Sequence, residues 1–338
     1  MSEGSVTIRD VARAVGLSVA TVSRALNGAS NVLPETRQRV LEAAQQLQFT
    51  PSSVARSLST RRHDCIGLLL PDLHGEYFSE LIRGIDQAAR ARGLALLVSS
   101  SHDDADEAAS ALRAMNGRVD GLLLMSPHAD TEFLRSKLPA RLPTVLLNTA
   151  ASLPDLPRLG IDNFGGARAM SAHLVAQLQE RPEARIAFIA GPAGNHEAAE
   201  RLRGFRAALP ARMQPWVLEG DFSEDSGYAA GRQLMRGRER PAAVFAANDM
   251  MAIGCLRALR EAGMAVPRDV ALAGFDDIPI SRYLTPALST VRVPIAQLGV
   301  AAFNTLLRRL EDPEAAPDSP QTLPLELVLR HSCGANPS

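Results

Sequence analysis

The pattern of apolar residues from Cys65 onward constrains the fold more than any other feature of this sequence. Apolar runs of strand length alternate there with stretches of helical periodicity. Such alternation indicates parallel sheets, and nearly continuous apolar strands indicate sheets that are covered on both faces. With this many units, two doubly wound domains fit better than one. The expected strands are 65–70, 94–98, 120–125, 144–148, 185–190, 215–219, 242–247 and 269–275, and the expected helices are 77–92, 104–117, 163–179, 198–209, 223–237 and 250–262.

The residues before this body have a different pattern, with apolar residues at helical spacing in three short segments. Thr7 with Asp10 three residues later is a capping-box pattern, and Gly16 suits the left-handed turn that ends a helix. The pattern predicts helices from Thr7 to Gly16, from Ser18 to Asn27-Gly28, and from Pro34 to about Gln48. Two short helices joined by a tight glycine turn form a helix-turn-helix. A purely structural helical hairpin is the alternative interpretation.

The charge of this segment favours DNA binding. The 338-residue chain has 36 basic and 37 acidic residues, a formal net charge of −1. Residues 1–62 carry eight basic and four acidic residues, a net charge of +4, which leaves −5 for the remainder. A basic segment joined to an acidic body indicates a segment that binds a polyanion.

Other classes of protein fit the sequence poorly. No uncharged stretch reaches the ~20 apolar residues of a membrane helix, and the first residues have no apolar signal-peptide core, so we expect a cytoplasmic protein and not a secreted sugar-transport protein. The three cysteines are far apart and the histidines lack ligand spacing, so no metal site is expected. The loop 191–194 lacks the dinucleotide spacing, and no P-loop or G-x-S-x-G occurs. We therefore expect neither an enzyme nor a cofactor.

Candidate ligand-binding residues follow from the position of the expected strand ends, where doubly wound sheets bind ligands. Arg201 and Asp276 can pair bidentately with vicinal sugar hydroxyls, although a salt bridge between strand ends is the alternative. Aromatic residues after the first strand can supply a wall, with core packing as the alternative for Phe78. The candidates are Tyr77, Phe78, Asn148, Arg201, Asn248 and Asp276, with Asp72 as a further one.

Several short motifs along the chain resemble those of a known protein family. TIRDVA at 7–12 and GLSVATVSRALN at 16–27 closely resemble the headpiece of the LacI/GalR (lactose-repressor) family. The similarity continues in ETR (35–37), FTP (49–51), ARSL (55–58), IG…PD (66–72), RLRGF (201–205), ANDMMAIG (247–254) and GFDD (274–277), and so covers essentially the whole chain. Leu33 stands where the family often has a serine cap, and Ser52 stands where it usually has asparagine.

This resemblance implies a small all-α helix-turn-helix headpiece and an α/β body like a periplasmic binding protein, with two parallel-sheet subdomains around a cleft. It implies a headpiece at 1–48, a hinge helix and linker at 49–63, and a body at 64–338. The first subdomain would comprise about 64–161 and 294–320, and the second about 162–292 and 321–338. Three crossovers are expected near 162–163, 292–294 and 320–323.

The resemblance also implies how DNA is bound. The family places the second headpiece helix in the major groove, which puts Val19, Ala20 and Arg24 at base edges. Arginine can bind guanine bidentately, whereas valine and alanine contact apolar groups such as the thymine methyl. Hydroxyl side chains suit phosphates, and Asn27 either contacts the DNA backbone or ends the helix. The expected phosphate contacts are Thr7, Ser18, Thr21 and Ser23.

The segment 52–59 corresponds to the family's hinge helix, which forms on specific DNA beside the hinge of a second subunit. Leu58 matches the leucine that wedges into the minor groove, and Ala55 lies one turn before it. In the cleft, Phe222 matches a position where an aromatic ring stacks on the ligand.

The resemblance therefore implies a homodimeric repressor of a carbohydrate-utilisation operon, which binds palindromic operator DNA and is controlled by a sugar in the cleft. The alternative is a regulator of the same family with a purine-type co-repressor. The C-terminal residues 331–338 have no leucine heptads, so a dimer is expected rather than a tetramer.

Overall fold

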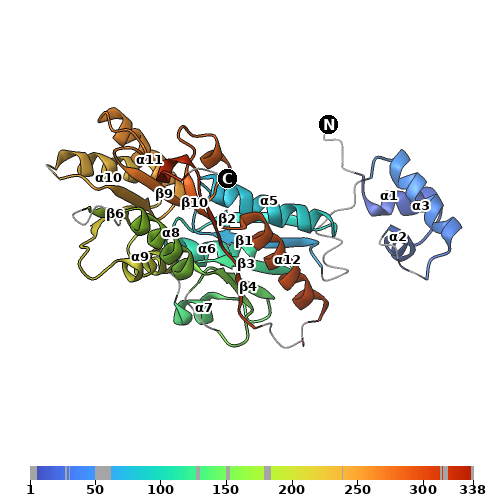
Figure 1. Ribbon diagram of the computed structural model, residues 1–338. Helices are drawn as coiled ribbons and strands as arrows, with labels where there is room; N and C mark the ends of the chain where they lie inside the picture. Colours follow the sequence, from blue (N-terminus) through green and yellow to red (C-terminus); the bar gives the residue numbers. More distant parts are fainter. Residues whose placement is uncertain are drawn as a thin grey trace. The chain divides into compact units, whose positions relative to one another are not determined.

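The computed structural model describes residues 6–26, 29, 31–49, 62–126, 130–149, 153–178, 184–237, 239–312, 314 and 319–335. The chain divides into two compact units, residues 1–64 and 65–338 (Figure 1). Asn27, Ala55 and Leu58 lie outside the described residues, so the predictions for them stay predictions.

The first unit contains the three helices that the sequence predicts, α1 (Ile8–Val15), α2 (Val19–Leu26) and α3 (Pro34–Gln46). The Asp10 carboxylate caps α1 by accepting hydrogen bonds from the backbone N–H and the hydroxyl of Thr7, at 3.0 and 2.7 Å. Gly16 ends α1 with a left-handed φ of 70°, a conformation that favours glycine. Leu33 offers α3 no side-chain cap, and Pro34 begins the helix with its fixed φ.

A small apolar core joins these helices. Each helix contributes one valine that is fully buried: Val11 from α1, Val22 from α2 and Val40 from α3. Because all three helices share this core, they form one folded body and not an isolated pair of helices.

The first sheet of the second unit is parallel throughout its described pairs, in the order β11-β5-β4-β3-β1-β2. Alternate residues of its strands pack into different clusters: Leu68 and Leu123 lie on the face covered by α5 and α12, and Leu69 lies on the face covered by α6. The elements are β1 (Cys65–Leu70), α5 (Glu76–Arg90), β2 (Ala95–Ser100), α6 (Ala105–Met115), β3 (Gly121–Met125), α7 (Thr131–Lys137), β4 (Thr144–Leu147), β5 (Arg158–Ile161), α12 (Ile295–Glu311) and β11 (Gln321–Leu323).

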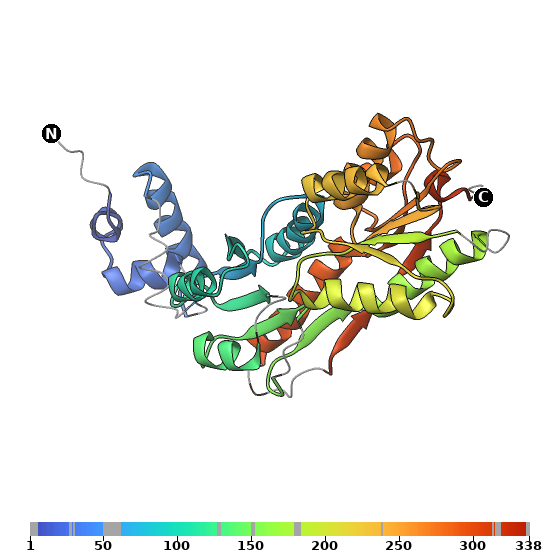
Figure 2. The same ribbon diagram turned by 90° about the vertical axis from the view of Figure 1, so that its left-hand side faces the viewer.

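The second sheet has the order β12-β10-β9-β8-β6-β7. The pair α8 and α9 covers one face and the pair α10 and α11 the other (Figure 2). The elements are α8 (Asn163–Gln177), β6 (Ile186–Ile189), α9 (His196–Ala208), β7 (Trp216–Leu218), α10 (Glu224–Arg236), β8 (Ala243–Ala246), α11 (Asp249–Glu261), β9 (Ala271–Asp276), η1 (Pro279–Arg282), β10 (Ser289–Arg292), β12 (Glu326–Val328) and η2 (His331–Cys333).

The chain crosses between the sheets three times. It leaves the first sheet after β5 at Asp162, returns between β10 and α12, and leaves again between β11 and β12. The third crossing lies after residues 321–323, and not before them, because β11 pairs with β5 in the first sheet. The expected boundary at 320/321 is therefore wrong by three residues. β12 runs antiparallel to β10, and only residues 324–325 separate it from β11.

Candidate functional site

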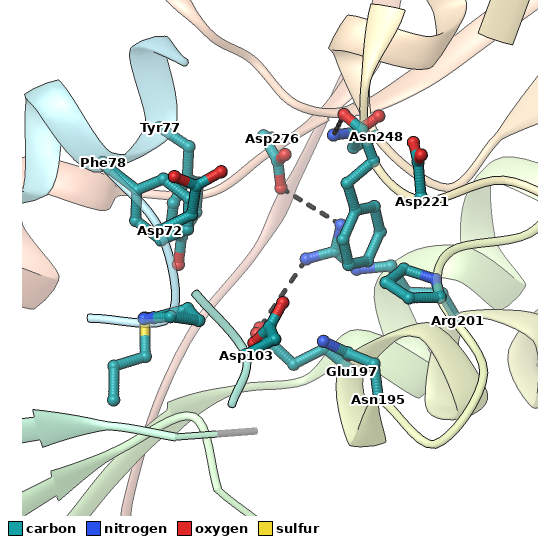
Figure 3. A pocket seen from close by; sticks show the side chains of 14 residues that line it. Asp72, Tyr77, Phe78, Asp103, Asn195, Glu197, Arg201, Asp221, Asn248 and Asp276 are labelled. Atoms are coloured by element: carbon teal, nitrogen blue, oxygen red, sulfur yellow. Dashed lines mark hydrogen bonds and ion pairs between the residues drawn. The ribbon is translucent and has the colours of Figure 1, made fainter. Parts of the chain in front are cut away.

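A cavity opens in the body where the carboxyl ends of both sheets meet (Figure 3). It encloses about 630 Å³, its open mouth included. We call it the cleft cavity. The first-sheet half contributes Pro71, Asp72, Tyr77, Phe78, Asp103 and Met125, and the second-sheet half contributes Pro192, Asn195, Glu197, Arg201, Asp221, Phe222, Asn248 and Asp276.

Arg201 lies at the centre of this cavity and is only 3% exposed. The sequence placed it at a strand end, but it lies within α9, so its long side chain reaches the cavity from a helix. Its Nε donates to Asn163 Oδ1 at 2.7 Å and its Nη1 donates to the Ala247 carbonyl oxygen at 2.6 Å. The guanidinium also lies 3.9 Å from the Phe275 ring centroid. These contacts fix the positive charge in place before any ligand arrives.

Two buried carboxylates flank this guanidinium. Glu197 lies 3.7 Å and Asp276 lies 3.3 Å from nitrogen atoms of Arg201. Asp276 therefore forms the salt bridge that was the alternative interpretation, and it also lines the cavity. Burial raises the pKa of both carboxyl groups, and Arg201 opposes that shift. Despite the ion pairs, Glu197 Oε1 and Asp276 Oδ1 accept no hydrogen bond from the part of the chain that the structure describes. Buried acceptors are normally satisfied, so these two atoms offer binding positions to a ligand that donates hydrogen bonds.

Phe222 forms a wall of the cavity and is held in a left-handed backbone conformation, with φ of 72°. Asn248 stabilises this loop, because its Nδ2 donates to the Phe222 carbonyl at 2.9 Å and its Oδ1 accepts from Met251 N at 2.9 Å. Asn248 thus lines the cavity but uses both ends of its amide inside the protein. A Cβ on Gly191 would lie 2.5 Å from the Phe222 ring, so glycine there makes room for the ring.

Tyr77 and Phe78 provide the opposite wall, with their rings edge to face at 5.5 Å. The Tyr77 hydroxyl accepts a hydrogen bond from Asn148 Nδ2 at 3.0 Å. Burial raises the pKa of Tyr77 well above its ordinary value, and the charges of Glu197 and Asp276 add to the shift. Asn148 itself does not line the cleft cavity: it supports Tyr77 from behind and lines a separate cavity.

Sequence reasoning missed four polar residues of the lining: Asp103, Asn195, Glu197 and Asp221. The rule of strand ends, applied to every strand, would have found three of them, since each follows β2, β6 or β7 within a few residues. Glu197 lies four residues before Arg201, and that helical spacing was the available signal.

The lining is mainly acidic, because one guanidinium faces five carboxyl groups. Two of these already accept backbone hydrogen bonds: Asp72 from Leu73 N at 2.6 Å, and Asp221 from Ser223 N at 2.8 Å. Such a surface favours neutral or cationic ligands over anions.

The headpiece presents the predicted DNA-reading residues on one helix. Val19 is 42% exposed, and Ala20 and Arg24 are also exposed, whereas Val22 and Ala25 are buried. The inward stripe of α2 is thus complete without Val19 and Ala20, which removes core packing as an explanation for them.

The predicted phosphate contacts lie before α1 (Thr7), before α2 (Ser18) and within α2 (Thr21 and Ser23). Thr7 and Ser18 are exposed, and Thr21 and Ser23 are half-buried. The Ser18 Oγ lies 2.8 Å from the Thr21 hydroxyl and accepts from Thr21 N at 3.1 Å, so it caps α2 as the sequence predicts.

Within the ranges that the structure describes, no helix is long and apolar enough to cross a bilayer. The same ranges contain no group of three or more His, Cys, Asp or Glu side chains placed to hold a metal ion.

Comparison with known proteins gives consistent results. Residues 7–52 match the model for bacterial regulatory proteins of the lacI family, and residues 175–333 match a periplasmic binding protein-like domain. The HTH-type transcriptional repressor PurR of Edwardsiella ictaluri is 34% identical over 98% of both chains. The lac repressor dimer bound to operator and the anti-inducer ONPF is 30% identical, with a TM-score of 0.86 over 98% of this chain and all of that one. The complex of the transcriptional regulator CelR with cellobiose is 30% identical, with a TM-score of 0.71 over 97% of this chain and 99% of that one.

Proposed function

Because the chain belongs to the lacI family of bacterial regulatory proteins, we propose that a small molecule in the cleft cavity controls how tightly its headpiece binds an operator. Like its relatives, the chain is a DNA-binding transcriptional repressor and not an enzyme. The expected division into headpiece 1–48, hinge 49–63 and body 64–338 is part of this proposal. A cavity whose two walls come from the two sheets supports it, because a ligand there contacts both halves of the body at once.

We infer that the ligand is a sugar. The observation that carries this inference is the pair of buried, unsatisfied acceptors, Glu197 Oε1 and Asp276 Oδ1, on either side of Arg201. Sugar hydroxyls donate to such oxygens and accept from the guanidinium, whereas a phosphate or carboxylate would meet like charge. Phe222 offers an apolar ring face to the C–H groups of a sugar. The cellobiose complex of the CelR regulator lends further support.

A purine-type co-repressor is the second candidate. The three aromatic residues Tyr77, Phe78 and Phe222 favour it, since a planar base stacks on such rings. The N–H groups of a purine can also donate to carboxylates. The relatives named PurR support this alternative.

A ligand panel separates the two candidates. The full chain would be screened by thermal shift and calorimetry against neutral monosaccharides, disaccharides, hypoxanthine and guanine. We expect a sugar to bind and the bases not to bind. Asp276→Asn should weaken the sugar at least tenfold, because a charge-assisted hydrogen bond is worth about 1.5–3 kcal/mol. Asp225→Asn is the matched control, since Asp225 is exposed and does not line the cavity. Binding of a base but of no sugar would establish the purine alternative.

We also propose a homodimer that binds a palindromic operator, with Arg24, Val19 and Ala20 at base edges and Thr7, Ser18, Thr21 and Ser23 near phosphates. A two-fold dimer matches a two-fold DNA site, and the lac repressor was solved as a dimer on its operator. Exposed apolar side chains at Leu73, Ile280 and Tyr283 support an interface. They lie on two segments that a hydrogen bond from Ile280 N to Glu76 Oε2 joins at 2.9 Å.

A further inference from the structure

A second cavity lies beside the first and shares one residue with it. It encloses about 780 Å³, its open mouth included. Its walls again come from both halves of the body: Asn148 and Gly160 from the first sheet, and Asn163 and Glu197 from the first turns of α8 and α9. Glu197 lines both cavities, so a single buried carboxylate faces two spaces. We call this space the hinge-side cavity, because β5 and β11, which adjoin crossovers, form part of its wall.

Two buried acceptors in this cavity have no hydrogen-bond partner among the described residues. Asn148 is 5% exposed, and its Nδ2 is committed to the Tyr77 hydroxyl, but its Oδ1 accepts nothing. Glu197 Oε1 is likewise unsatisfied. The two atoms belong to opposite halves of the body. Because buried acceptors are normally satisfied, they indicate that a hydrogen-bond donor binds between the halves.

The chemistry of that donor follows from its surroundings. Both unsatisfied atoms are acceptors, so a group between them must donate hydrogen bonds. Arg158 and His196 also line this cavity, so a group that accepts hydrogen bonds as well as donating them fits the lining. A purely apolar group would leave both unsatisfied. The exposed Gln321 and Thr322 on β11 add an amide and a hydroxyl at the rim, which can both donate and accept. A group with several hydroxyls meets these requirements.

We propose that the hinge-side cavity binds a second sugar unit, with Glu197 shared between the two units. This inference rests on the proposed sugar-binding function and extends it to a ligand class, a disaccharide or two monosaccharides. One ligand that spans both cavities would contact Phe222 and Asp276 at one end and Asn148 at the other.

Gly160 supplies the means to test this proposal. A Cβ on Gly160 would have only one non-neighbouring atom within 4 Å, Asn148 Oδ1 at 3.6 Å. Its φ is not in the left-handed region, so the backbone accepts a larger side chain. A leucine there would occupy the space in front of the unsatisfied oxygen, whereas alanine would leave most of the cavity open. Neither change touches the lining of the cleft cavity.

The experiment is calorimetry of full-length wild type, Gly160→Leu and Gly160→Ala with D-glucose, D-galactose, cellobiose and lactose. We expect a disaccharide to bind wild type more tightly than its constituent monosaccharides. Gly160→Leu should weaken that disaccharide at least about tenfold and leave the affinity of a monosaccharide in the cleft cavity within about twofold, and Gly160→Ala should resemble wild type. Where wild type binds two monosaccharides, Gly160→Leu should bind only one. Thr322→Trp blocks the same cavity from its exposed rim, so the test survives if Gly160→Leu fails to fold.

Stoichiometry identifies the occupant. One disaccharide per chain indicates a single ligand across both cavities, and two monosaccharides per chain indicate two separate sugars. Sugar binding that is insensitive to Gly160→Leu and Thr322→Trp, or equal loss of mono- and disaccharides, would overturn this inference and leave the proposed function standing. Binding of no sugar at all would overturn the proposed function as well.

Discussion

Arg201 neutralises two buried carboxylates as well as facing the ligand cavity, so its removal has a structural cost. Without it, Glu197 and Asp276 would remain buried with no cation beside them. We expect Arg201→Ala to lower the free energy of unfolding by about 3–5 kcal/mol, the usual loss when one member of a buried ion pair is removed. Urea denaturation of the full chain measures this.

Arg203→Ala is the control, because Arg203 lies on the same helix but forms an exposed pair with Glu200. Its loss should change stability by less than about 1 kcal/mol. Similar losses for the two variants would mean that Arg201 is not a structural cation.

Asp249 gives the body a pH-dependent stability. Its buried carboxyl accepts from Thr290 Oγ1 at 2.6 Å, Ser281 Oγ at 2.7 Å and Ile278 N at 2.9 Å, yet burial raises its pKa to about 7. A folded-state pKa above the unfolded value means that the folded protein binds the proton more tightly. The stabilisation is therefore complete below about pH 4 and is lost as the pH rises through about 7.

We expect wild-type stability to fall between about pH 4 and 7, with a contribution from Asp249 of about 4 kcal/mol at most. Asp249→Asn should flatten this fall, because an amide keeps the geometry and does not titrate; Glu197 and Asp276 still contribute in the same direction. Denaturation at a series of pH values measures the slope. Equal slopes for the variant and wild type would contradict this role.

The sequence predicts which residues line the cleft cavity better than it predicts which side chains contact one another there. Arg201, Asp276 and Phe222 line the cavity as predicted, and Asp276 forms the salt bridge to Arg201 that the sequence offers as an alternative, but Glu197 is not among the predicted residues. Glu197 lies one helical turn before Arg201, which was a local signal, but only the fold shows that both side chains are buried beside Asp276, a residue far away in the chain. Asn148 was predicted for the cleft cavity but lines the other one, because a strand-end position alone does not show which cavity a side chain faces.

Among the elements, α2 presents exposed residues that we predict to contact DNA bases, and a single substitution can test this. Its inward stripe is Val22 and Ala25, and Arg24 is exposed beside it, with Nε bound to the Ala20 carbonyl oxygen at 3.3 Å. We expect Arg24→Ala to weaken operator binding by about 1–3 kcal/mol, because a bidentate contact to guanine is lost. Non-specific DNA binding should change much less, and helix content should be unchanged. Anisotropy titrations with operator and scrambled DNA measure both, and equal losses on the two DNAs would refute base reading.

The elements that the sequence predicts are those with strong local signals. The headpiece helices and the eight strands with long apolar runs are confirmed. The strands β5, β10 and β11 are missed because they are only three or four residues long and have no continuous apolar run. Arg158 and Gly160 interrupt it in β5, Arg292 ends it in β10, and β11 begins with the polar pair 321–322. Their strand conformation comes from pairing with neighbours distant in sequence, and local pattern cannot show that.

At the scale of the whole molecule, the exposed apolar side chains predict assembly. Tyr283 is 74% exposed, which is unusual for so large a side chain unless another surface covers it. We expect wild type to be a dimer in sedimentation equilibrium and Tyr283→Asp to dissociate at concentrations where wild type stays dimeric. Val217→Asp is the control, because Val217 is also exposed but lies on β7, three strands from β9 in the sheet order. A monomeric wild type, or a stable tetramer, would contradict this prediction.

In the proposed function, the cleft ligand and the operator affect each other's binding. Linkage requires that the sugar change operator affinity by the same factor by which the operator changes sugar affinity. The direct measurement is a pair of titrations of the full chain: operator affinity with and without saturating sugar, and sugar affinity with and without operator, using the sugar and operator that binding screens identify. We expect equal factors in the range of about 5 to 150, a coupling of about 1–3 kcal/mol. If Asp276→Asn abolishes the binding of a sugar that leaves operator affinity unchanged, the cleft cavity does not control DNA binding.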